Sequence, residues 1–291
     1  MGPFLAVFLI LLGFLPAALV APELRLNLEA GLYDHLPPTW GYWKGWESGW
    51  IPKPCREAAE QRQLNPWEME VYSVKFTDCD EPWTICCHFS DSSSIVSMVE
   101  TFGKIPLGMR EYVSTIVTLP SLGPGAAGVT YSETDIPVIG IRYGFFQEEL
   151  LAHEISHILD FHALKQYTNG SDFSTGSWWK GNYSLDDAAE NFAEAGGAAL
   201  YDLVVPGGLS DITADAKSVS HVISTYKNVL GDIIKPRSKP KCTKRWANHQ
   251  VVPVDDRRIP PYPAPDVRIK AKGIEQIANP GKKEIKCVLP H

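Results

Sequence analysis

The sequence lacks several features that would assign it to a membrane, repeat or small zinc-binding class. After residue 21 no stretch is apolar enough to span a bilayer, and no internal repeat is present. No C-x-x-C pair occurs, which argues against cysteine-rich zinc modules. The whole chain has 291 residues, of which 44% are apolar and 21% are charged. This length and composition are typical of a globular protein of one or two domains with a sizeable core.

Positive charge is scarce over most of the chain and is concentrated at its end. The formal net charge is −7, but from Lys235 onward fourteen Lys and Arg face five Asp and Glu, which leaves −16 for residues 1–234. So acidic a body argues against a nucleic-acid partner. The basic end can bind an anionic polymer or lie against the acidic body, and we favour the second interpretation.

The first 21 residues contain no Lys or Arg, but they are apolar for nearly twenty positions and end in small residues. This pattern favours a cleaved secretory signal over a stable membrane anchor. We therefore expect a secreted, extracellular protein that can associate with a cell wall. The expected parts are the signal (1–21), an aromatic- and Cys-rich segment (22–90), a catalytic domain (91–234) and a basic, Pro-rich tail packed on the body (235–291).

Six cysteines fit an exported protein and indicate three disulfides. A bond between adjacent Cys86 and Cys87 would be strained, so twelve of the fifteen possible connectivities remain. Two sequons, at Asn169 and Asn182, can carry N-glycans in a eukaryotic secretory pathway. The cysteines are Cys55, Cys79, Cys86, Cys87, Cys242 and Cys287.

Periodicity and turn residues predict the elements that precede the candidate site. Alternation of apolar and polar residues indicates a first strand, whose return runs through the central cysteines. Pro106 can open a helix, and Pro120 ends it. The expected elements are a strand at 67–76, a helix at 95–102 capped by residues 91–94, a helix at 107–119, and strands at 129–131 and 138–143.

The central motif is His153-Glu154-Ile155-Ser156-His157, within what reads as one uninterrupted amphipathic helix, Phe146–Tyr167. Two imidazoles at i and i+4 share a helix face, where both can bind one tetrahedral Zn²⁺, and the glutamate between them can act as a general base. His162 lies about 140° round the helix from His157 and is expected to be structural. Asp160 and Ala163 stand where the extended metzincin motif has Gly and His, so this is not a metzincin.

A second helix, 184–203, is expected to approach the first. Glu190 and Glu194 share one of its faces, and burying two carboxylates together is costly unless a cation faces them. A zinc ion and a histidine would serve, whereas the alternative is an acidic face in solvent. Gly196 and Gly197 make this helix slim enough to pack closely on a neighbour, and a further helix, 211–230, is expected to pack under the site.

The segments HEISHILD and Y-x6-E-N-F-A-E-A resemble the catalytic domain of lethal-factor-like zinc metallopeptidases, a gluzincin branch, over about residues 129–203. The resemblance implies that His153, His157 and Glu190 bind zinc. It further implies Glu154 as the general base, Tyr183 as the group that stabilises the oxyanion, and Glu194 and Asp160 as acids beside the ligands. The residues around Cys79 and Cys86 instead look like secreted fungal proteins of the conidiation-specific type.

Together these features predict an α+β, zincin-like fold with a small mixed sheet over the H-E-x-x-H helix and a mainly helical lower part. The expected function is a secreted, zinc-dependent endopeptidase that acts on a peptide or protein substrate. The alternative is a non-catalytic secreted cell-wall or binding protein, or an effector, that keeps the fold and uses the aromatic segment around Trp43 and Trp46 as its contact surface. The oligomeric state is left open.

Overall fold

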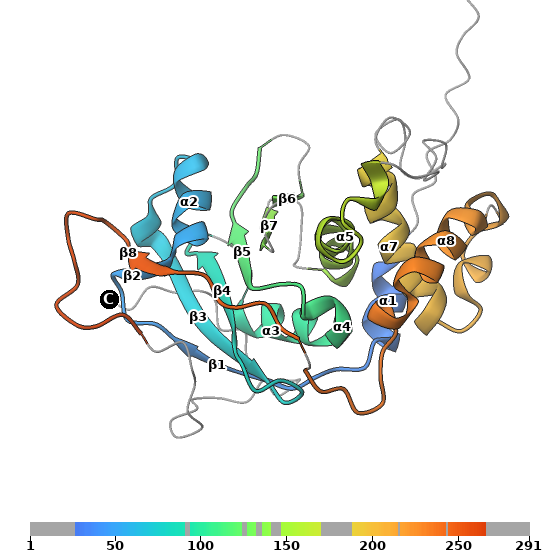
Figure 1. Ribbon diagram of the computed structural model, residues 1–291, viewed down its shortest axis with the longest axis horizontal. Coiled ribbons are helices and arrows are strands. Elements are labelled where there is room, and N and C mark those ends of the chain that lie inside the picture. The colour runs from blue at the N-terminus through green and yellow to red at the C-terminus, as the bar shows by residue number, and fades with distance from the viewer. Residues whose placement is uncertain are drawn as a thin grey trace, which may run out of the picture.

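The computed structural model describes residues 27–90, 94–123, 127–131, 136–140, 147–169, 188–214, 216–242 and 244–265. A six-stranded sheet and a group of helices lie side by side, with α5, α7, α8 and α1 on the side away from β1 and β3 (Figure 1). The predicted α+β class is therefore confirmed. The expected signal, residues 1–21, lies outside the described residues.

In the part of the chain that the structure describes, the elements fall into two long stretches: the first contains every strand of the six-stranded sheet together with four α-helices, and the second is mainly helical. The first contains α1 (Glu29–His35), β1 (Gly41–Gly45), β2 (Trp50–Pro52), α2 (Lys53–Gln61), η1 (Pro66–Glu68), β3 (Met69–Phe76), β4 (Trp83–His88), α3 (Ile95–Lys104), α4 (Leu107–Arg110), β5 (Thr115–Leu119), β6 (Gly128–Tyr131) and β7 (Ile136–Gly140). The second contains α5 (Glu148–Ile158), η3 (Leu159–Ala163), η4 (Tyr167–Asn169), α7 (Ala188–Val204), η5 (Gly208–Asp211), α8 (Ala216–Ile234) and β8 (Val251–Pro253).

The main sheet has the strand order β1-β3-β4-β5-β7-β6. Its first three strands are antiparallel, β4, β5 and β7 run parallel to one another, and β6 returns antiparallel to β7 at the edge. Strands from both sides of residue 90 thus belong to one sheet. β3 is buried at every second position as far as Ser73, as its sequence predicts, but Val74 and Phe76 on the opposite face are buried too, so the expectation of a single apolar face is wrong. β4 and β5 are buried along their whole length, as expected for central strands covered on both faces.

The predicted helix at 107–119 is wrong. Pro106 does precede a helix, but α4 spans only Leu107–Arg110, and the chain then enters strand β5, Thr115–Leu119. The sequence of β5, TIVTL, has β-branched residues at four of five positions. Such side chains suit a pleated, buried strand better than a helix, and pairing with β4 and β7 decides the outcome.

The predicted start of α3 is confirmed by its cap. The Ser94 hydroxyl accepts a hydrogen bond from the N–H of Ser97 at 3.1 Å, and the helix runs over Ile95–Lys104. The start of α5 is capped from elsewhere in the chain. The carboxylate of Glu29, in α1, accepts the N–H groups of Glu148 and Glu149 at 3.4 and 3.0 Å.

The helix predicted over 146–167 is interrupted. α5 ends at Ile158 and continues as a π-helical turn, η3, in which the N–H of Leu164 donates to the carbonyl of Leu159. Lys165 and Gln166 then adopt positive φ of 55° and 61°. Asp160 causes the break, because its carbonyl accepts Gln166 N–H and its carboxylate accepts Thr168 N–H and hydroxyl.

Helices α5, α7 and α8 meet at Gly196. A Cβ added there would lie 1.9 Å from Ser156 Oγ of α5 and 2.9 Å from the Tyr226 hydroxyl of α8. Those two hydroxyl oxygens are themselves 2.7 Å apart. The close packing expected from the small residues of this helix is therefore present, and it is strictest at Gly196. At Gly197 the nearest atoms would be 3.8 Å away, an ordinary contact.

The disulfides join distant parts of the chain. Cys55 bonds to Cys86 and Cys79 bonds to Cys242. Cys87 is also disulfide-bonded, so the adjacent cysteines take different partners, as predicted. Cys287 lies outside the described residues. Further along the tail, β8 pairs with β2 in a second, two-stranded sheet.

Candidate metal centre

Helix α5 places His153 and His157 one turn apart on the same face. Their ring centroids are 5.0 Å apart and the rings are inclined at 81°. Both side chains are partly buried, with exposed fractions of 17% and 15%. This is the spacing that the motif predicts, because residues i and i+4 of a helix lie one above the other.

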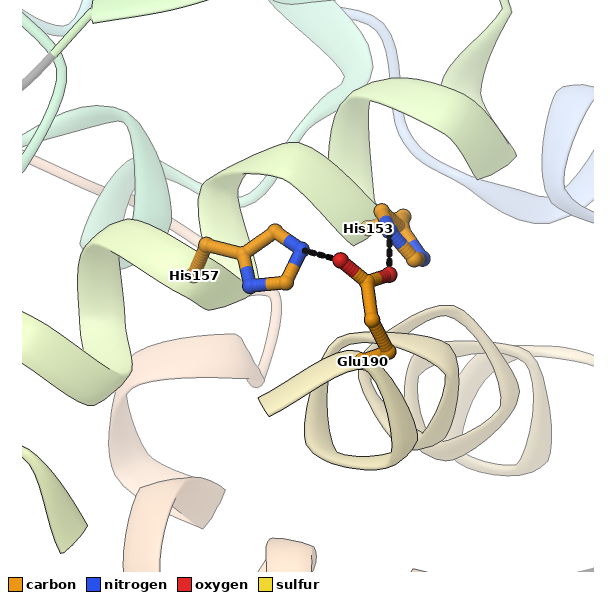
Figure 2. A group of neighbouring side chains, drawn as sticks. All are labelled: His153, His157 and Glu190. Atoms are coloured by element: carbon orange, nitrogen blue, oxygen red, sulfur yellow. Dashed lines mark ion pairs between the residues drawn. The ribbon is translucent and has the colours of Figure 1, made fainter. Parts of the chain in front are cut away.

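Glu190, in the first turn of α7, points between the two rings (Figure 2). One carboxylate oxygen lies 3.4 Å from His153 Nε2 and the other lies 3.5 Å from His157 Nε2. Two ligand atoms bound at 2.0–2.1 Å to a tetrahedral Zn²⁺ are about 3.3 Å apart, so each nitrogen–oxygen separation, taken by itself, is close to that of two ligands of one ion. His153, His157 and Glu190 can each offer one atom, all within 4.8 Å of one another. Two imidazoles and one carboxylate are also a donor set that zinc prefers.

Burial and opposite charge act against each other at these residues. Burial favours the neutral imidazole of His153, but the nearby carboxylates, Glu190 foremost, raise its pKa overall. Burial likewise opposes the charge of Glu190, yet bonds from both histidines hold the pKa of that carboxyl far below its usual range. The site is therefore built to keep a carboxylate ionised beside two imidazoles.

Glu194 lies one turn beyond Glu190 on α7 and faces the other nitrogen of His153. Its Oε1 is 3.6 Å from His153 Nδ1. A carboxylate on the outer nitrogen orients a ligating imidazole and leaves Nε2 toward the metal position. Glu190 and Glu194 thus address opposite nitrogens of the same ring.

Glu154 points from α5 to the edge strand β6. Its side chain is almost fully buried, and Oε2 accepts a hydrogen bond of 2.7 Å from the hydroxyl of Thr130. Burial raises the pKa of the Glu154 carboxyl, against the opposing effect of the two histidines. Gly128, on the same strand, leaves room for this carboxylate, because a Cβ there would lie 2.1 Å from Oε1.

The remaining predicted site residues are placed as follows. Asp160 has both carboxylate oxygens engaged by Thr168 and so acts on the turn after α5. Tyr183 and Asn182 lie outside the described residues, as does the side chain of Asn169. The sequence does not predict the roles of Thr130 and Gly128, because a threonine and a glycine in a short strand carry no signal that they will meet Glu154, 24 and 26 positions later.

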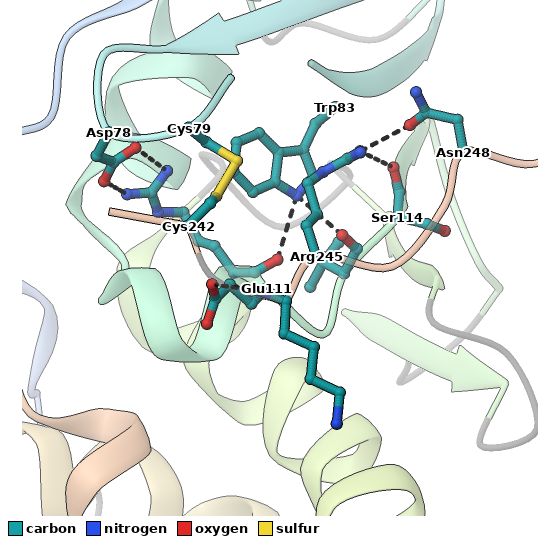
Figure 3. Close-up of a disulfide and its surroundings, with 11 residues drawn as sticks. Asp78, Cys79, Trp83, Glu111, Ser114, Cys242, Arg245 and Asn248 are labelled. Carbon is teal, nitrogen blue, oxygen red and sulfur yellow. Dashed lines mark hydrogen bonds and ion pairs between the residues drawn. A yellow bond between two sulfur atoms is a disulfide. The ribbon is translucent and has the colours of Figure 1, made fainter. Parts of the chain in front are cut away.

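The C-terminal segment passes the Cys79–Cys242 disulfide and then runs beside Trp83 and Ser114 (Figure 3). Beyond the Cys79–Cys242 disulfide, the Arg245 guanidinium lies 4.6 Å from the centre of the Trp83 ring and donates to Ser114 and Asn248. The next residue, Trp246, packs its ring 4.4 Å from the ring of His162. His162 therefore lies against the tail, away from His153 and His157.

The aromatic segment is mostly packed. Trp43 is buried, and Trp46 donates its ring N–H to the Ser73 hydroxyl at 2.8 Å. The most exposed aromatic residues of this segment are Tyr33, 57% exposed, and Trp40, 45% exposed. A contact surface centred on Trp43 and Trp46 does not fit this packing. In the part of the chain that the structure describes, no helix is long and apolar enough to cross a membrane.

Comparison with known proteins identifies a relative by sequence but no matching solved structure. Conidiation-specific protein 13 of Neurospora crassa is 25% identical over 220 residues, which cover 71% of this chain and 62% of that protein. The chain therefore spans less than two thirds of the length of this curated relative. No solved structure matches.

The family comparison corrects the resemblance to lethal-factor-like zinc metallopeptidases. The family model of the conidiation-specific protein Con-13 matches residues 25–266, a range that includes α5 and α7 with the proposed ligands. Neither this match nor the fungal relative is a peptidase by description. The likeness to peptidases is thus confined to short segments and does not assign the family. The chain belongs to the family of the conidiation-specific protein Con-13.

Proposed function

We propose that this protein is a secreted, zinc-dependent hydrolase that cleaves peptide bonds. The observation that carries the proposal is the convergence of His153, His157 and Glu190 from two helices, with the carboxylate of Glu154 next to them in sequence and buried. Three protein ligands and a fourth, open position are the usual arrangement of a catalytic zinc site. The two disulfides between described cysteines fit an exported protein.

The chemistry would be divided between the metal and the chain. Zinc bound by the three ligands would lower the pKa of water and polarise a carbonyl oxygen. Glu154 would accept a proton from the attacking water and return it to the departing amine. Glu194 would keep the His153 ring in the orientation that ligation requires.

The arrangement of the sheet supports a peptide as the substrate. β6 is the edge strand of the main sheet, and it packs on α5 through the contact between Thr130 and Glu154. An extended peptide can pair with a free strand edge and so present its backbone to a neighbouring site. Such a placement of an edge strand above an H-E-x-x-H helix is what a zincin-like fold would need, and we propose that fold on this basis.

Two measurements on the purified protein test the proposal. Metal analysis is expected to find one zinc per chain, and a peptide library is expected to contain cleaved members. Glu154→Gln should retain zinc and lose cleavage, because the amide cannot accept a proton. Glu57→Gln, a change to an exposed carboxylate on α2, is the matched control and should cleave as the parent does. Cleavage by the Glu154→Gln protein at the parental rate would exclude the mechanism.

A second candidate is a non-catalytic secreted wall or binding protein in which a metal would be structural. The family match favours it, because the conidiation-specific proteins are not described as enzymes. It predicts bound zinc, no cleaved peptide in the library, and retention on a fungal wall polysaccharide. Trp40→Ala would then weaken retention, since Trp40 is exposed, whereas the buried Trp43 would matter only for folding.

A further inference from the structure

We infer that Thr130 is a positioning residue for Glu154. Its hydroxyl, carried on the edge strand of the sheet, holds the carboxylate that would act as the general base. The inference rests on the proposed hydrolase function, because it assigns a role to a neighbour of the proposed base. It adds a residue that lies outside the H-E-x-x-H motif and outside α7.

The first support is the hydrogen bonding of Thr130. Its Oγ1 lies 2.7 Å from Glu154 Oε2 and 3.0 Å from the backbone carbonyl oxygen of the same residue. A threonine hydroxyl has one proton to donate, and the shorter contact is the one to the carboxylate. Glu154 is only 3% exposed, so water competes little for this bond. A hydrogen bond to an ionised carboxylate is also stronger than one between neutral groups.

The second support is the absence of a side chain at Gly128. A Cβ there would lie 2.1 Å from Glu154 Oε1 and 2.6 Å from its Cδ, so the carboxylate occupies the space of a side chain. Gly128 and Thr130 are two residues apart on β6 and therefore face the same side of the strand. Together they fix the position of the carboxylate: Thr130 bonds one of its oxygens, and Gly128 leaves room for the other.

The carboxylate needs these contacts because α5 fixes only the backbone of Glu154. The side chain has three rotatable bonds, and a catalytic carboxylate must be held to within about 0.5 Å of its working position. His153 and His157 have Glu190, and His153 also has Glu194, to set their orientation. Thr130 supplies the corresponding constraint for Glu154, and it does so from the strand along which we propose that substrate lies.

The test compares Thr130→Val, which keeps the shape but loses the hydroxyl, with Thr130→Ser, which keeps the hydroxyl. For a cleaved peptide, Thr130→Val should lower kcat roughly 10- to 100-fold with KM nearly unchanged, the loss expected for one hydrogen bond to a charged group. Thr130→Ser should restore kcat to within a few-fold of the parent. Zinc content should be one per chain in both variants, because neither touches a ligand.

A readout without turnover keeps this inference separate from the proposed function. With Co²⁺ in place of zinc, the visible absorption reports the surroundings of the metal. Glu154→Gln sets the reference change, Thr130→Val and Gly128→Ala should shift the spectrum in the same direction, and Thr130→Ser should match the parent. If Glu154→Gln changes the spectrum and Thr130→Val does not, the positioning role is overturned and the hydrolase proposal stands.

The other outcomes are equally decisive. If the parent binds zinc but cleaves no peptide, the proposed function fails, whereas the spectra still show whether Thr130 holds Glu154. If Glu154→Gln leaves both cleavage and spectrum unchanged, both proposals fall. Equal losses of zinc content or melting temperature in Thr130→Val and Thr130→Ser would assign Thr130 a role in packing and would overturn the inference.

Discussion

Gly196→Ala should both destabilise the fold and weaken the metal centre, because Gly196 sets how closely α7 approaches α5. The added methyl would lie 1.9 Å from Ser156 Oγ and 2.9 Å from the Tyr226 hydroxyl, far inside contact distance. Both hydroxyls are buried and bonded to each other, so they cannot swing into solvent. Overpacking of this kind costs about 1–3 kcal/mol, of which the better helix propensity of alanine would offset roughly 0.5–1 kcal/mol.

Gly197→Ala is the matched control on the same helix. Its methyl would meet its nearest neighbours at 3.8 Å, so only the gain in helix propensity remains and this variant should be as stable as the parent or up to about 1 kcal/mol more stable. Denaturant unfolding of the metal-free proteins measures the difference between the two. Because Glu190 is carried by the same helix, Gly196→Ala should also lower zinc affinity. Equal stability of the two variants would refute the packing argument.

Two further predictions concern carboxylates. Glu190→Gln should abolish stoichiometric zinc binding in a metal titration, whereas Glu194→Gln should keep the site and weaken affinity roughly 10- to 100-fold, the usual effect of losing a group that orients a ligand. Equal losses would mean that both residues are ligands. Burial and the neighbouring Glu29 raise the pKa of Glu148 from 4.5 to about 8, so its contribution to stability is full below pH 4.5 and is lost as the pH rises through 8. The melting temperature of the parent should therefore fall relative to that of Glu148→Gln between pH 5 and pH 9, and parallel curves would contradict this.

The sequence predicts those parts of the fold in which local pattern and tertiary packing agree. The alternating sequence of β3 does form a strand, Met69–Phe76, and the cap at Ser94 starts α3 where its side chain can reach the N–H of Ser97. Prediction fails where a distant partner decides. β5 reads as the continuation of a helix opened by Pro106, but it is buried between two parallel strands that no local signal reveals. The break after Ile158 likewise depends on bonds that Asp160 makes several residues later.

The residues of the candidate site also differ in how far the sequence predicts them, because some depend on local periodicity and others on contacts between distant elements. His153 and His157 follow from helical periodicity alone, since i and i+4 must share a face. Glu190 could be proposed from a face shared with Glu194, but that this face meets α5 depends on the contact at Gly196 between three helices. The role of Thr130 could not be predicted from the sequence. The fold of the sheet brings β6 to Glu154, and no spacing in the sequence indicates that contact.

Charge balance, independent of any family resemblance, is the strongest reason to expect a cation here. Glu154, Glu190 and Glu194 bring up to three negative charges to two partly buried imidazoles, and Glu154 itself is almost fully buried. Carboxylates gathered away from water are costly unless a positive charge lies among them. One divalent ion between His153, His157 and Glu190 would neutralise two of the three charges and leave Glu154 as the base. The name of the conidiation-specific family states no chemistry, so it leaves this argument intact. Metal analysis therefore decides more than further comparison can. If the protein, purified without chelators, holds no zinc, then protonated histidines must balance these carboxylates, and the proposal fails at its first step.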